Sequence, residues 1–200
     1  MIKTMKRKIF MGKNSAMLKV FFSVMKGDKQ SIDLVIPKKY VKSIKDIDYN
    51  LLKKNNMKNL IFDIDNTIMP VNDINVTKEL LEFMNSLKRD FNICILSNNN
   101  ENRVNPVKEK LNVLGFANAK KPSRYAYEKA LELLHSNANN TVMIGDQMLS
   151  DIVFANKYNL YSILVEPYKN KYDIKTGFSR VLQNIMMKKL KKKIKRYNYY

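Results

Sequence analysis

The sequence predicts an α/β fold, a doubly wound Rossmann-like parallel sheet with helices on both faces, and two observations support this prediction. Between residues 58 and 165, short apolar runs alternate with amphipathic segments long enough to form helices. Such runs are typical of strands in a parallel sheet that is covered on both faces. Polar and charged residues follow each of the first four runs, and ligands bind at the carboxyl ends of the strands in such sheets.

The predicted elements follow one another in regular order, beginning with a short helix around residues 47–55. The apolar runs predict strands at residues 58–63, 91–97, 116–119, 140–145 and 160–165. The segments between the strands predict helices at residues 77–89, 101–114, 123–135 and 149–158. Thr77 is expected to cap the first of these four helices, and Gly115 is expected to end the second.

The charge of the chain favours anionic partners. Lys and Arg number 37 against 18 Asp and Glu, which gives a formal net charge of +19 and favours phosphates, nucleic acid or an anionic bilayer. We divide the chain into a basic extension (residues 1–35), a folded domain (36–180) and a basic tail (181–200). No acidic residue precedes Asp28. Residues 1–27 could therefore be a mitochondrial presequence, a membrane-surface segment or a segment without a folded role.

The tail has the pattern of a basic amphipathic helix. Its apolar residues recur at helical spacing, and they are Leu182, Ile185, Met186, Leu190, Ile194 and Tyr197. Lysines and one arginine fill the other positions from residue 188 to residue 196. This combination favours a helix that lies on an anionic membrane. Two alternatives stay open, because the apolar stripe could instead pack on the domain and the tail could bind nucleic acid.

The cysteine and histidine content argues against two kinds of chemistry. The single cysteine, Cys94, lies in an apolar run, so no internal disulfide can form and we expect a core residue. The single histidine, His135, ends an amphipathic stretch and is expected at a helix C-terminus, which argues against Ser-His-Asp catalysis. No apolar run approaches the roughly 18 residues of a membrane-spanning helix.

Carboxylates, a hydroxyl group, an amide and a lysine follow the predicted strands. They are Asp63 and Asp65 after the first strand, Ser97 and Asn98 after the second, Lys121 after the third, and Asp146 and Asp151 after the fourth. Because the carboxyl ends of parallel strands share one edge of the sheet, we expect these side chains to meet there. Carboxylates can attack phosphorus and bind a divalent cation, and a lysine can offset phosphate charge. The set therefore predicts phosphoryl transfer.

Four short motifs carry a resemblance to a known superfamily. They are DIDNT, SNNN, KKP and GDQMLSD, in that order, and they resemble the four motifs of the haloacid dehalogenase (HAD) phosphatases, which use an aspartate nucleophile. Within this superfamily the chain is similar to the YqeG family and to the related mitochondrial phosphatidylglycerophosphatases. The segment YVKSIKDID ahead of the first motif and the triple asparagine of the second motif carry this finer similarity, which runs from about residue 36 to about residue 196.

The resemblance implies a role for each motif residue. Asp63 would be the nucleophile that forms an aspartyl-phosphate, and Asp65 would act as the acid and then as the base. The phosphoryl group would be bound by Ser97, Asn98 and Lys121, with Lys120 as the alternative lysine.

The resemblance also implies Mg²⁺ as the cofactor. Its ligands would be Asp63, the backbone carbonyl of Asp65, and Asp146, with Thr67 and Asp151 supporting these ligands from behind. Mg²⁺ prefers oxygen ligands in octahedral geometry, which suits this set.

The spacing of the motifs leaves no room for a cap domain. The gaps from Thr67 to Ser97 and from Ser97 to Lys121 each hold about one helix and one strand. Such an open site suits a large or surface-bound substrate. The resemblance implies an anionic phospholipid as substrate, phosphatidylglycerophosphate, which would be hydrolysed to phosphatidylglycerol in phospholipid biosynthesis. The protein would be peripheral, on the inner face of a cell membrane or on the matrix side of a mitochondrion.

Two other functions stay open. The first is a capless phosphatase that acts on nucleic-acid 3′-phosphate ends or on soluble phosphomonoesters. The second is a basic nucleic-acid-binding protein whose motifs are inert, and the four intact motifs argue against it. The sequence has no recognised nucleic-acid-binding motif, so no nucleic-acid partner is expected.

Overall fold

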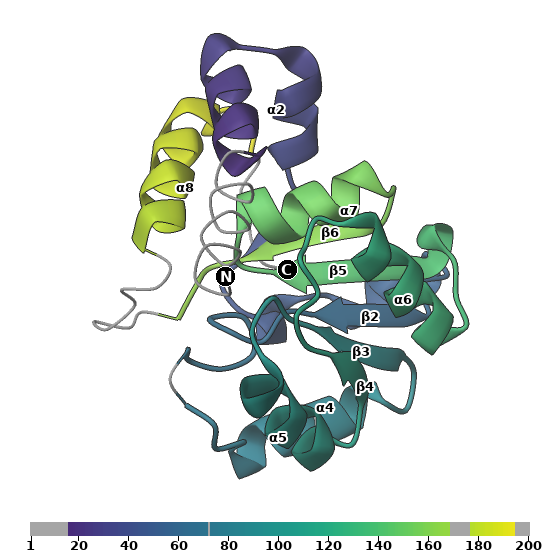
Figure 1. The fold of residues 1–200 in the computed structure, drawn as a ribbon. Coiled ribbons are helices and arrows are strands. Elements are labelled where there is room, and N and C mark those ends of the chain that lie inside the picture. Colours follow the sequence, from purple (N-terminus) through teal and green to yellow (C-terminus); the bar gives the residue numbers. More distant parts are fainter. Residues whose placement is uncertain (1–15, 72, 169–176, 195–200) are drawn as a thin grey trace.

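A parallel sheet forms the centre of the molecule in the computed structural model, which describes residues 16–71, 73–168 and 177–194 (Figure 1). Over these residues the sheet has six strands in the order β1-β6-β5-β2-β3-β4, and neighbouring strands are parallel. The strands are β1 (Lys39–Val41), β2 (Asn59–Phe62), β3 (Asn92–Leu96), β4 (Leu114–Phe116), β5 (Thr141–Gly145) and β6 (Tyr161–Val165). The predicted fold class is confirmed.

Helices cover both faces of the sheet. On one face lie α3 (Tyr49–Lys54), α4 (Lys78–Leu87) and α5 (Glu101–Leu111). The other face carries α6 (Arg124–Leu134) and α7 (Val153–Lys157), with α2 (Lys29–Val35), α8 (Gly177–Leu190) and a helix over residues 16–26 beyond them. Short helical turns are η1 (Ile44–Asp46), η2 (Ala138–Asn140) and η3 (Met148–Ile152).

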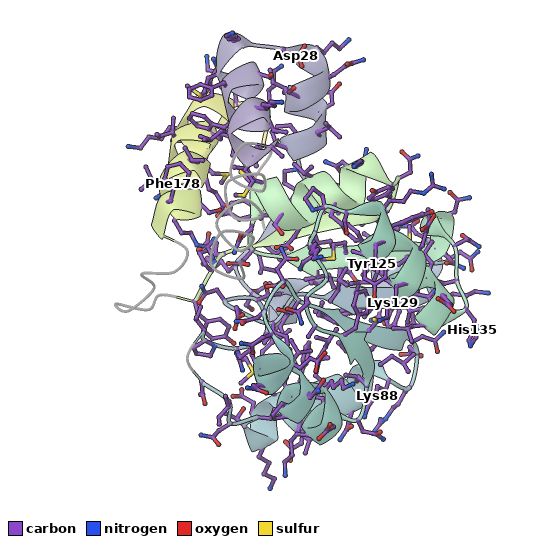
Figure 2. The ribbon with its side chains drawn as sticks, in the orientation of Figure 1. Asp28, Lys88, Tyr125, Lys129, His135 and Phe178 are labelled. Atoms are coloured by element: carbon purple, nitrogen blue, oxygen red, sulfur yellow. The ribbon has the colours of Figure 1, made fainter. Side chains whose placement is uncertain are left out.

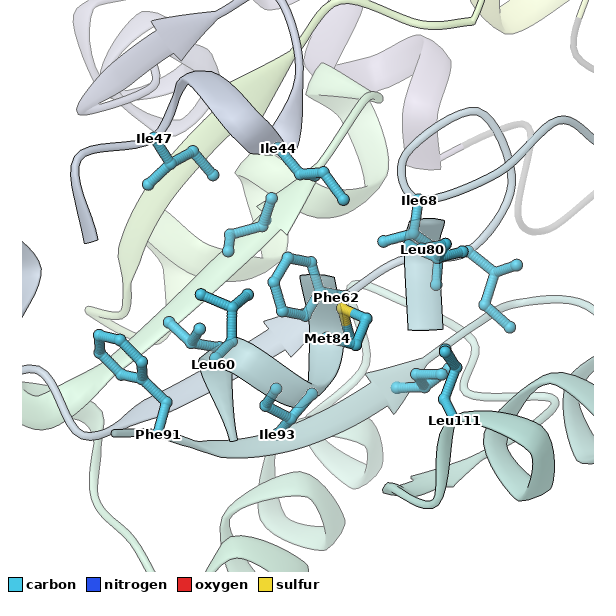
Figure 3. Packing of buried hydrophobic residues seen from close by; sticks show 14 of the residues in the cluster. Ile44, Ile47, Leu60, Phe62, Ile68, Leu80, Met84, Phe91, Ile93 and Leu111 are labelled. Carbon is cyan, nitrogen blue, oxygen red and sulfur yellow. The ribbon is translucent and has the colours of Figure 1, made fainter. Parts of the chain in front are cut away.

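The central strands supply side chains to both faces because successive residues of a strand point in opposite directions. In β2, Leu60 and Phe62 belong to the cluster that contains Met84 of α4, and Figure 3 shows these three side chains there. Ile61 belongs to the opposite cluster together with Cys94. Cys94 is fully buried as predicted, and burial raises the pKa of its thiol to about 12, so it is an inert core residue.

Two expected element boundaries are corrected. Helix α5 ends at Leu111 because Asn112 adopts the left-handed conformation at its C-terminus, so Gly115 does not end this helix. Gly115 lies inside β4, where a Cβ atom would be 2.6 Å from the backbone oxygen of Ile95. A glycine is therefore required for β4 to approach β3, and the strand begins at Leu114 rather than at residue 116.

Two further local expectations hold, whereas the helix over residues 16–26, α2 and strand β1 were not predicted. The Thr77 hydroxyl caps α4 by accepting a hydrogen bond from Leu80 N at 3.1 Å, and His135 is the C-terminal cap residue of α6. Strand β1 was not predicted, because three residues are too few to show a period of two.

The described parts of the two basic ends pack together. The helix over residues 16–26, α2 and α8 form one hydrophobic cluster with η3 and β6, and Figure 1 shows them side by side. The cluster contains four residues of the predicted amphipathic stripe, namely Leu182, Met186, Leu190 and Ile194. The expectation that this stripe faces a membrane is therefore wrong, because the stripe packs on the domain. Residues 1–15 and Tyr197 lie outside the described residues.

No cap domain interrupts the sheet in the described chain. Between Thr67 and Ser97 lie α4 and β3, and between Ser97 and Lys121 lie α5 and β4. Every helix in the described ranges is too short or too polar to cross a bilayer.

Candidate active site

Asp63 lies directly after β2, where Lys121 reaches it from the loop after β4. The Lys121 ammonium nitrogen is 2.7 Å from Asp63 Oδ1 and 2.7 Å from Asp151 Oδ1. All three residues are buried, and charges are buried in proteins when they are paired. The structure thus brings three of the predicted site residues together. The side chain at the alternative position, Lys120, is exposed.

A third carboxylate, Asp146, completes a candidate metal site. Oxygen atoms of Asp63, Asp146 and Asp151 lie within 4.8 Å of one another. Asp146 is fully buried and accepts a hydrogen bond from the Thr67 hydroxyl at 3.3 Å. Because Mg²⁺ prefers carboxylate oxygens, these residues fit a divalent cation. Asp151 was expected to support the metal ligands rather than to bind the metal itself. In the structure its carboxylate lies within the same 4.8 Å as those of the two predicted ligands, Asp63 and Asp146.

The turn after β5 brings Asp146 and Asp151 to the same side. Asp151 lies in the π-helical turn η3, where its backbone N–H donates to Gln147 O at 2.8 Å and its carboxylate accepts from Gln147 N at 3.1 Å. Gly145 makes this approach possible, because a Cβ atom there would lie 2.4 Å from the Asp151 carboxyl group. Any side chain at position 145 would push this carboxylate out of place.

Burial and pairing shift the pKa values of the central groups. Burial raises the pKa of the Asp63 carboxyl group, Lys121 lowers it in part, and the result is a pKa of about 7. Burial lowers the pKa of Lys121, but Asp151 and Asp63 raise it more, so the pKa lies above its ordinary value. Lys121 is therefore a cation at neutral pH. A divalent cation beside Asp63 would lower the pKa of this carboxyl group, because an opposite charge favours the anion.

The residues after β3 hold the loop that carries Lys121. The Lys121 N–H donates to Asn98 Oδ1 at 2.6 Å, and Asn98 Nδ2 donates to Ser150 Oγ at 3.2 Å. The Ser97 hydroxyl accepts from Asn99 N at 3.1 Å. Asn98 therefore uses both ends of its amide within the protein, and phosphate binding by Ser97 and Asn98 stays a prediction.

Asp65 is not one of the three clustered carboxylates, and it is held by two donors that the sequence did not predict. Arg103 Nε donates to Asp65 Oδ1 at 2.9 Å, and Asn99 Nδ2 donates to Asp65 Oδ2 at 3.0 Å. The sequence gives no signal for Arg103, because an arginine at the start of a helix usually faces solvent. Its burial in the structure, with 8% of the residue exposed, is what marks it as part of the site.

Helix α8 reaches the site from the C-terminal part of the chain. Arg180 donates to Asp146 O at 3.0 Å and forms an ion pair with the Asp146 carboxylate. Gln183 donates to the same backbone oxygen at 2.9 Å and accepts from Met148 N at 2.9 Å. Burial lowers the pKa of Arg180 to about 10, so Arg180 stays cationic at neutral pH. No sequence motif marks these two residues.

Comparison with known sequences places the site in a family. Residues 118–173 match a family model described as HAD-hydrolase-like. The chain is 33% identical over 159 residues to the probable phosphatase YqeG of Bacillus subtilis, an alignment that covers 79% of this chain and 92% of the relative. It is 25% identical over 156 residues to phosphatidylglycerophosphate phosphatase 1, chloroplastic/mitochondrial, of Arabidopsis thaliana, which covers 72% of this chain and 44% of that protein.

Comparison with solved structures gives lower similarity. The cobalt-bound deoxy-D-mannose-octulosonate 8-phosphate phosphatase of Haemophilus influenzae has a TM-score of 0.45 at 16% identity, and the match covers 68% of this chain and 90% of that one. The 3-deoxy-D-manno-octulosonate 8-phosphate phosphatase of Yersinia pestis has a TM-score of 0.44 at 13% identity, with 72% and 88% covered. The family assignment therefore rests on the similarity to the YqeG phosphatase and not on these structures.

Proposed function

The chain belongs to the HAD-like hydrolases, in the family of the YqeG phosphatase, and on that premise we propose that it hydrolyses a phosphomonoester through an aspartyl-phosphate on Asp63, with phosphatidylglycerophosphate as its substrate. One observation carries this proposal: the Lys121 ammonium lies 2.7 Å from the carboxylates of both Asp63 and Asp151, beside the buried carboxylate of Asp146. A phosphate dianion is repelled by a carboxylate nucleophile, and cations in a buried site offset that repulsion.

In the first step, a carboxylate oxygen of Asp63 attacks phosphorus and the bond from phosphorus to the leaving oxygen breaks. Asp65 gives its proton to that oxygen, so the alcohol leaves as a neutral molecule. Lys121 keeps its pairing with Asp151 when Asp63 changes from an anion to an acyl phosphate.

In the second step, water attacks phosphorus and the bond from phosphorus to Asp63 breaks. Asp65, now a carboxylate, takes a proton from the water. Inorganic phosphate leaves, and Asp63 and Asp65 return to their starting protonation states.

The residues that would hold Mg²⁺ are Asp63, Asp146 and Asp151, together with the backbone carbonyl of Asp65. When bound there, the cation would neutralise charge on the phosphoryl oxygens. Lys121 and Arg180 are two cations against three buried carboxylates, which leaves one negative charge for a metal to balance.

Two features of the described chain support a substrate with an apolar part. One is the open site, since no cap domain lies between the motifs. The other is a pocket of about 380 Å³ beside the Lys121 loop. Its apolar lining includes Ala16, Met17, Val20, Leu149 and Val153, and the cations Lys120 and Lys157 also line it. The Arabidopsis relative, a phosphatidylglycerophosphate phosphatase, supports the specific lipid.

The outward face of α8 is the surface that would lie on an anionic membrane. Phe178, Val181 and Ile185 recur on this face with 55%, 56% and 39% of each residue exposed, and Figure 2 shows Phe178 at the outer edge of the molecule. Exposed lysines follow at residues 191–193. Exposed apolar residues next to lysines favour the surface of an anionic bilayer.

The test is phosphate release in the presence of Mg²⁺ from three kinds of substrate: vesicles that contain phosphatidylglycerophosphate, a panel of soluble phosphomonoesters, and 3′-phosphorylated oligonucleotides. The proposal expects the vesicles to be hydrolysed with the highest kcat/KM. Faster hydrolysis of the oligonucleotides or of a soluble ester would reject the lipid and keep the chemistry. Asp63→Asn serves as the inactive control for every substrate.

A further inference from the structure

We propose that Arg103 is the positioning residue that aims Asp65 at the leaving group. This role rests on the proposed function, because that function makes Asp65 the acid and the base. The first observation is burial: Arg103 leaves 8% of its surface exposed although it lies in the first turn of α5. A guanidinium group is buried when its donors have fixed acceptors.

The guanidinium group contacts the loop that carries Asp65 at both of its ends. Its Nε donates to Asp65 Oδ1 at 2.9 Å, and its Nη2 donates to Pro70 O at 3.1 Å. The Met69 sulfur lies 3.8 Å from Nη1. Because the guanidinium is planar and rigid, these contacts fix the distance between the Asp65 carboxylate and the end of its own loop.

The loop itself is tightly closed by backbone contacts that do not involve the Asp65 carboxylate. Asn66 N donates to Met69 O at 2.8 Å, and a β-bridge joins residues 65 and 69. The Asp65 side chain has 15% of its surface exposed. Of the two donors that hold it, Arg103 lies within helix α5, whereas Asn99 lies in the turn just before that helix.

The two donors leave Asp65 able to exchange a proton. Arg103 binds one carboxylate oxygen and Asn99 binds the other, and each oxygen has two lone pairs. One lone pair on each oxygen therefore stays available for the proton that passes to the leaving alcohol. Arg103 orients the carboxyl group and does not itself give or take the transferred proton.

A general acid held in the wrong orientation changes the ratio of rates on two substrates, whereas a damaged fold does not. An alkyl alkoxide is a poor leaving group and needs the proton of Asp65 when the bond to phosphorus breaks. A p-nitrophenolate is a good leaving group and departs without that proton. Loss of the correct orientation of Asp65 should therefore slow hydrolysis of an alkyl phosphate far more than hydrolysis of p-nitrophenyl phosphate. The ratio of the two rates in one sample does not depend on the folded fraction, because both substrates meet the same molecules.

The experiment compares Arg103→Gln and Arg103→Lys with the unaltered protein on two substrates. One is p-nitrophenyl phosphate, and the other is the alkyl phosphate that the unaltered protein hydrolyses fastest in the panel above. We expect Arg103→Gln to lower kcat for the alkyl phosphate at least about tenfold more than for p-nitrophenyl phosphate, which is part of the ~10²–10⁴-fold that a general acid contributes. Arg103→Lys keeps the charge and one donor, so its ratio of rates should lie between that of Arg103→Gln and that of the unaltered protein.

Tyr168→Phe is the matched control. The Tyr168 hydroxyl donates to Ile68 O in the same loop at 3.4 Å and does not touch Asp65, so its removal should leave the ratio of rates unchanged. Equal losses on both substrates in Arg103→Gln, or an equal change of ratio in Tyr168→Phe, would overturn the role of Arg103. Failure of the proposed function has a different readout, since Asp63→Asn would then still hydrolyse both substrates.

Discussion

At the scale of single residues, the site consists of charges that neutralise one another in a buried space. Lys121 lies between Asp63 and Asp151, Arg180 pairs with Asp146, and Arg103 pairs with Asp65. Removing one member of a buried pair leaves its partner uncompensated and costs about 3–5 kcal/mol. Substitutions that keep the shape of a side chain are therefore the most informative ones.

Asp63→Asn should abolish turnover and leave the fold intact. The amide cannot attack phosphorus, whereas Lys121 keeps its ion pair with Asp151. Phosphate release measures the activity, and circular dichroism with a thermal melt checks the fold. The exposed Asp33→Asn is the control for the same chemical change. Near-normal release by folded Asp63→Asn protein would reject the aspartyl-phosphate mechanism.

Asp146→Asn should weaken Mg²⁺ binding more than Asp151→Asn does. Asp151 is already paired with Lys121 at 2.7 Å, so we expect its loss to act mainly on kcat through Lys121. We expect a loss of affinity of at least about tenfold for Asp146→Asn, the lower end of the effect of altering the groups around a metal. Calorimetric titration with Mg²⁺ measures the affinity directly. The reverse order of affinities would show that Asp151 is the stronger ligand.

At low Mg²⁺, the rate on p-nitrophenyl phosphate should rise with pH through about 7. Burial raises the pKa of Asp63 to about 7, so the carboxyl group is protonated and cannot attack below that pH. Saturating Mg²⁺ should shift the midpoint to lower pH, because a cation favours the carboxylate. Rate profiles at two Mg²⁺ concentrations test the shift, and a midpoint that does not move would argue against a metal beside Asp63.

At the scale of secondary-structure elements, α8 has two roles. Its inward face joins the cluster with α2 and the helix over residues 16–26, and its first turns hold Asp146 through Arg180 and Gln183. Deleting α8 would therefore disturb the site and the core together. Single substitutions are needed to separate packing from surface binding.

Met186→Ala should lower the free energy of unfolding by about 2–5 kcal/mol, the usual cost of truncating a fully buried Met. Met186 has no exposed surface in the cluster. The exposed Lys188→Ala on the same helix should change stability by less than about 0.5 kcal/mol. Urea denaturation measures both. Equal small effects would show that the stripe is not part of the core.

At the scale of the whole molecule, the described parts of the two basic ends, residues 16–35 and 181–194, lie on one side of the sheet. The helix over residues 16–26 and α8 pack together beyond α7, while α3, α4 and α5 cover the opposite face. This is the side that the proposed function places against an anionic membrane.

Replacing Lys191, Lys192 and Lys193 by Gln should weaken binding to anionic vesicles and leave stability unchanged. Each cation near such a surface contributes about 1 kcal/mol, and screening limits its reach to about 8 Å at physiological ionic strength. Added salt should weaken binding in the same direction. Vesicle co-sedimentation measures binding. The control replaces Lys54, Lys78 and Lys110 of α3, α4 and α5. Equal loss in both triple variants would mean that binding follows total charge rather than this side.

Much of the fold and most of the carboxylate cluster could be predicted from the sequence because the relevant signals are local. Apolar runs and helical periods mark elements over a few residues, and the rule that parallel strands share one ligand-binding edge brings Asp63, Lys121, Asp146 and Asp151 together. Thr77 and His135 were predicted for the same reason, since a cap depends on its own helix.

The remaining features depend on contacts between distant segments, for which the chain has no local pattern. Arg103 is 38 residues from Asp65, and Arg180 is 34 residues from Asp146. The amphipathic stripe of α8 could face a membrane or a core equally well on its spacing alone. Packing selects the core, because the helix over residues 16–26 and α2 offer apolar side chains that bury Leu182, Met186, Leu190 and Ile194.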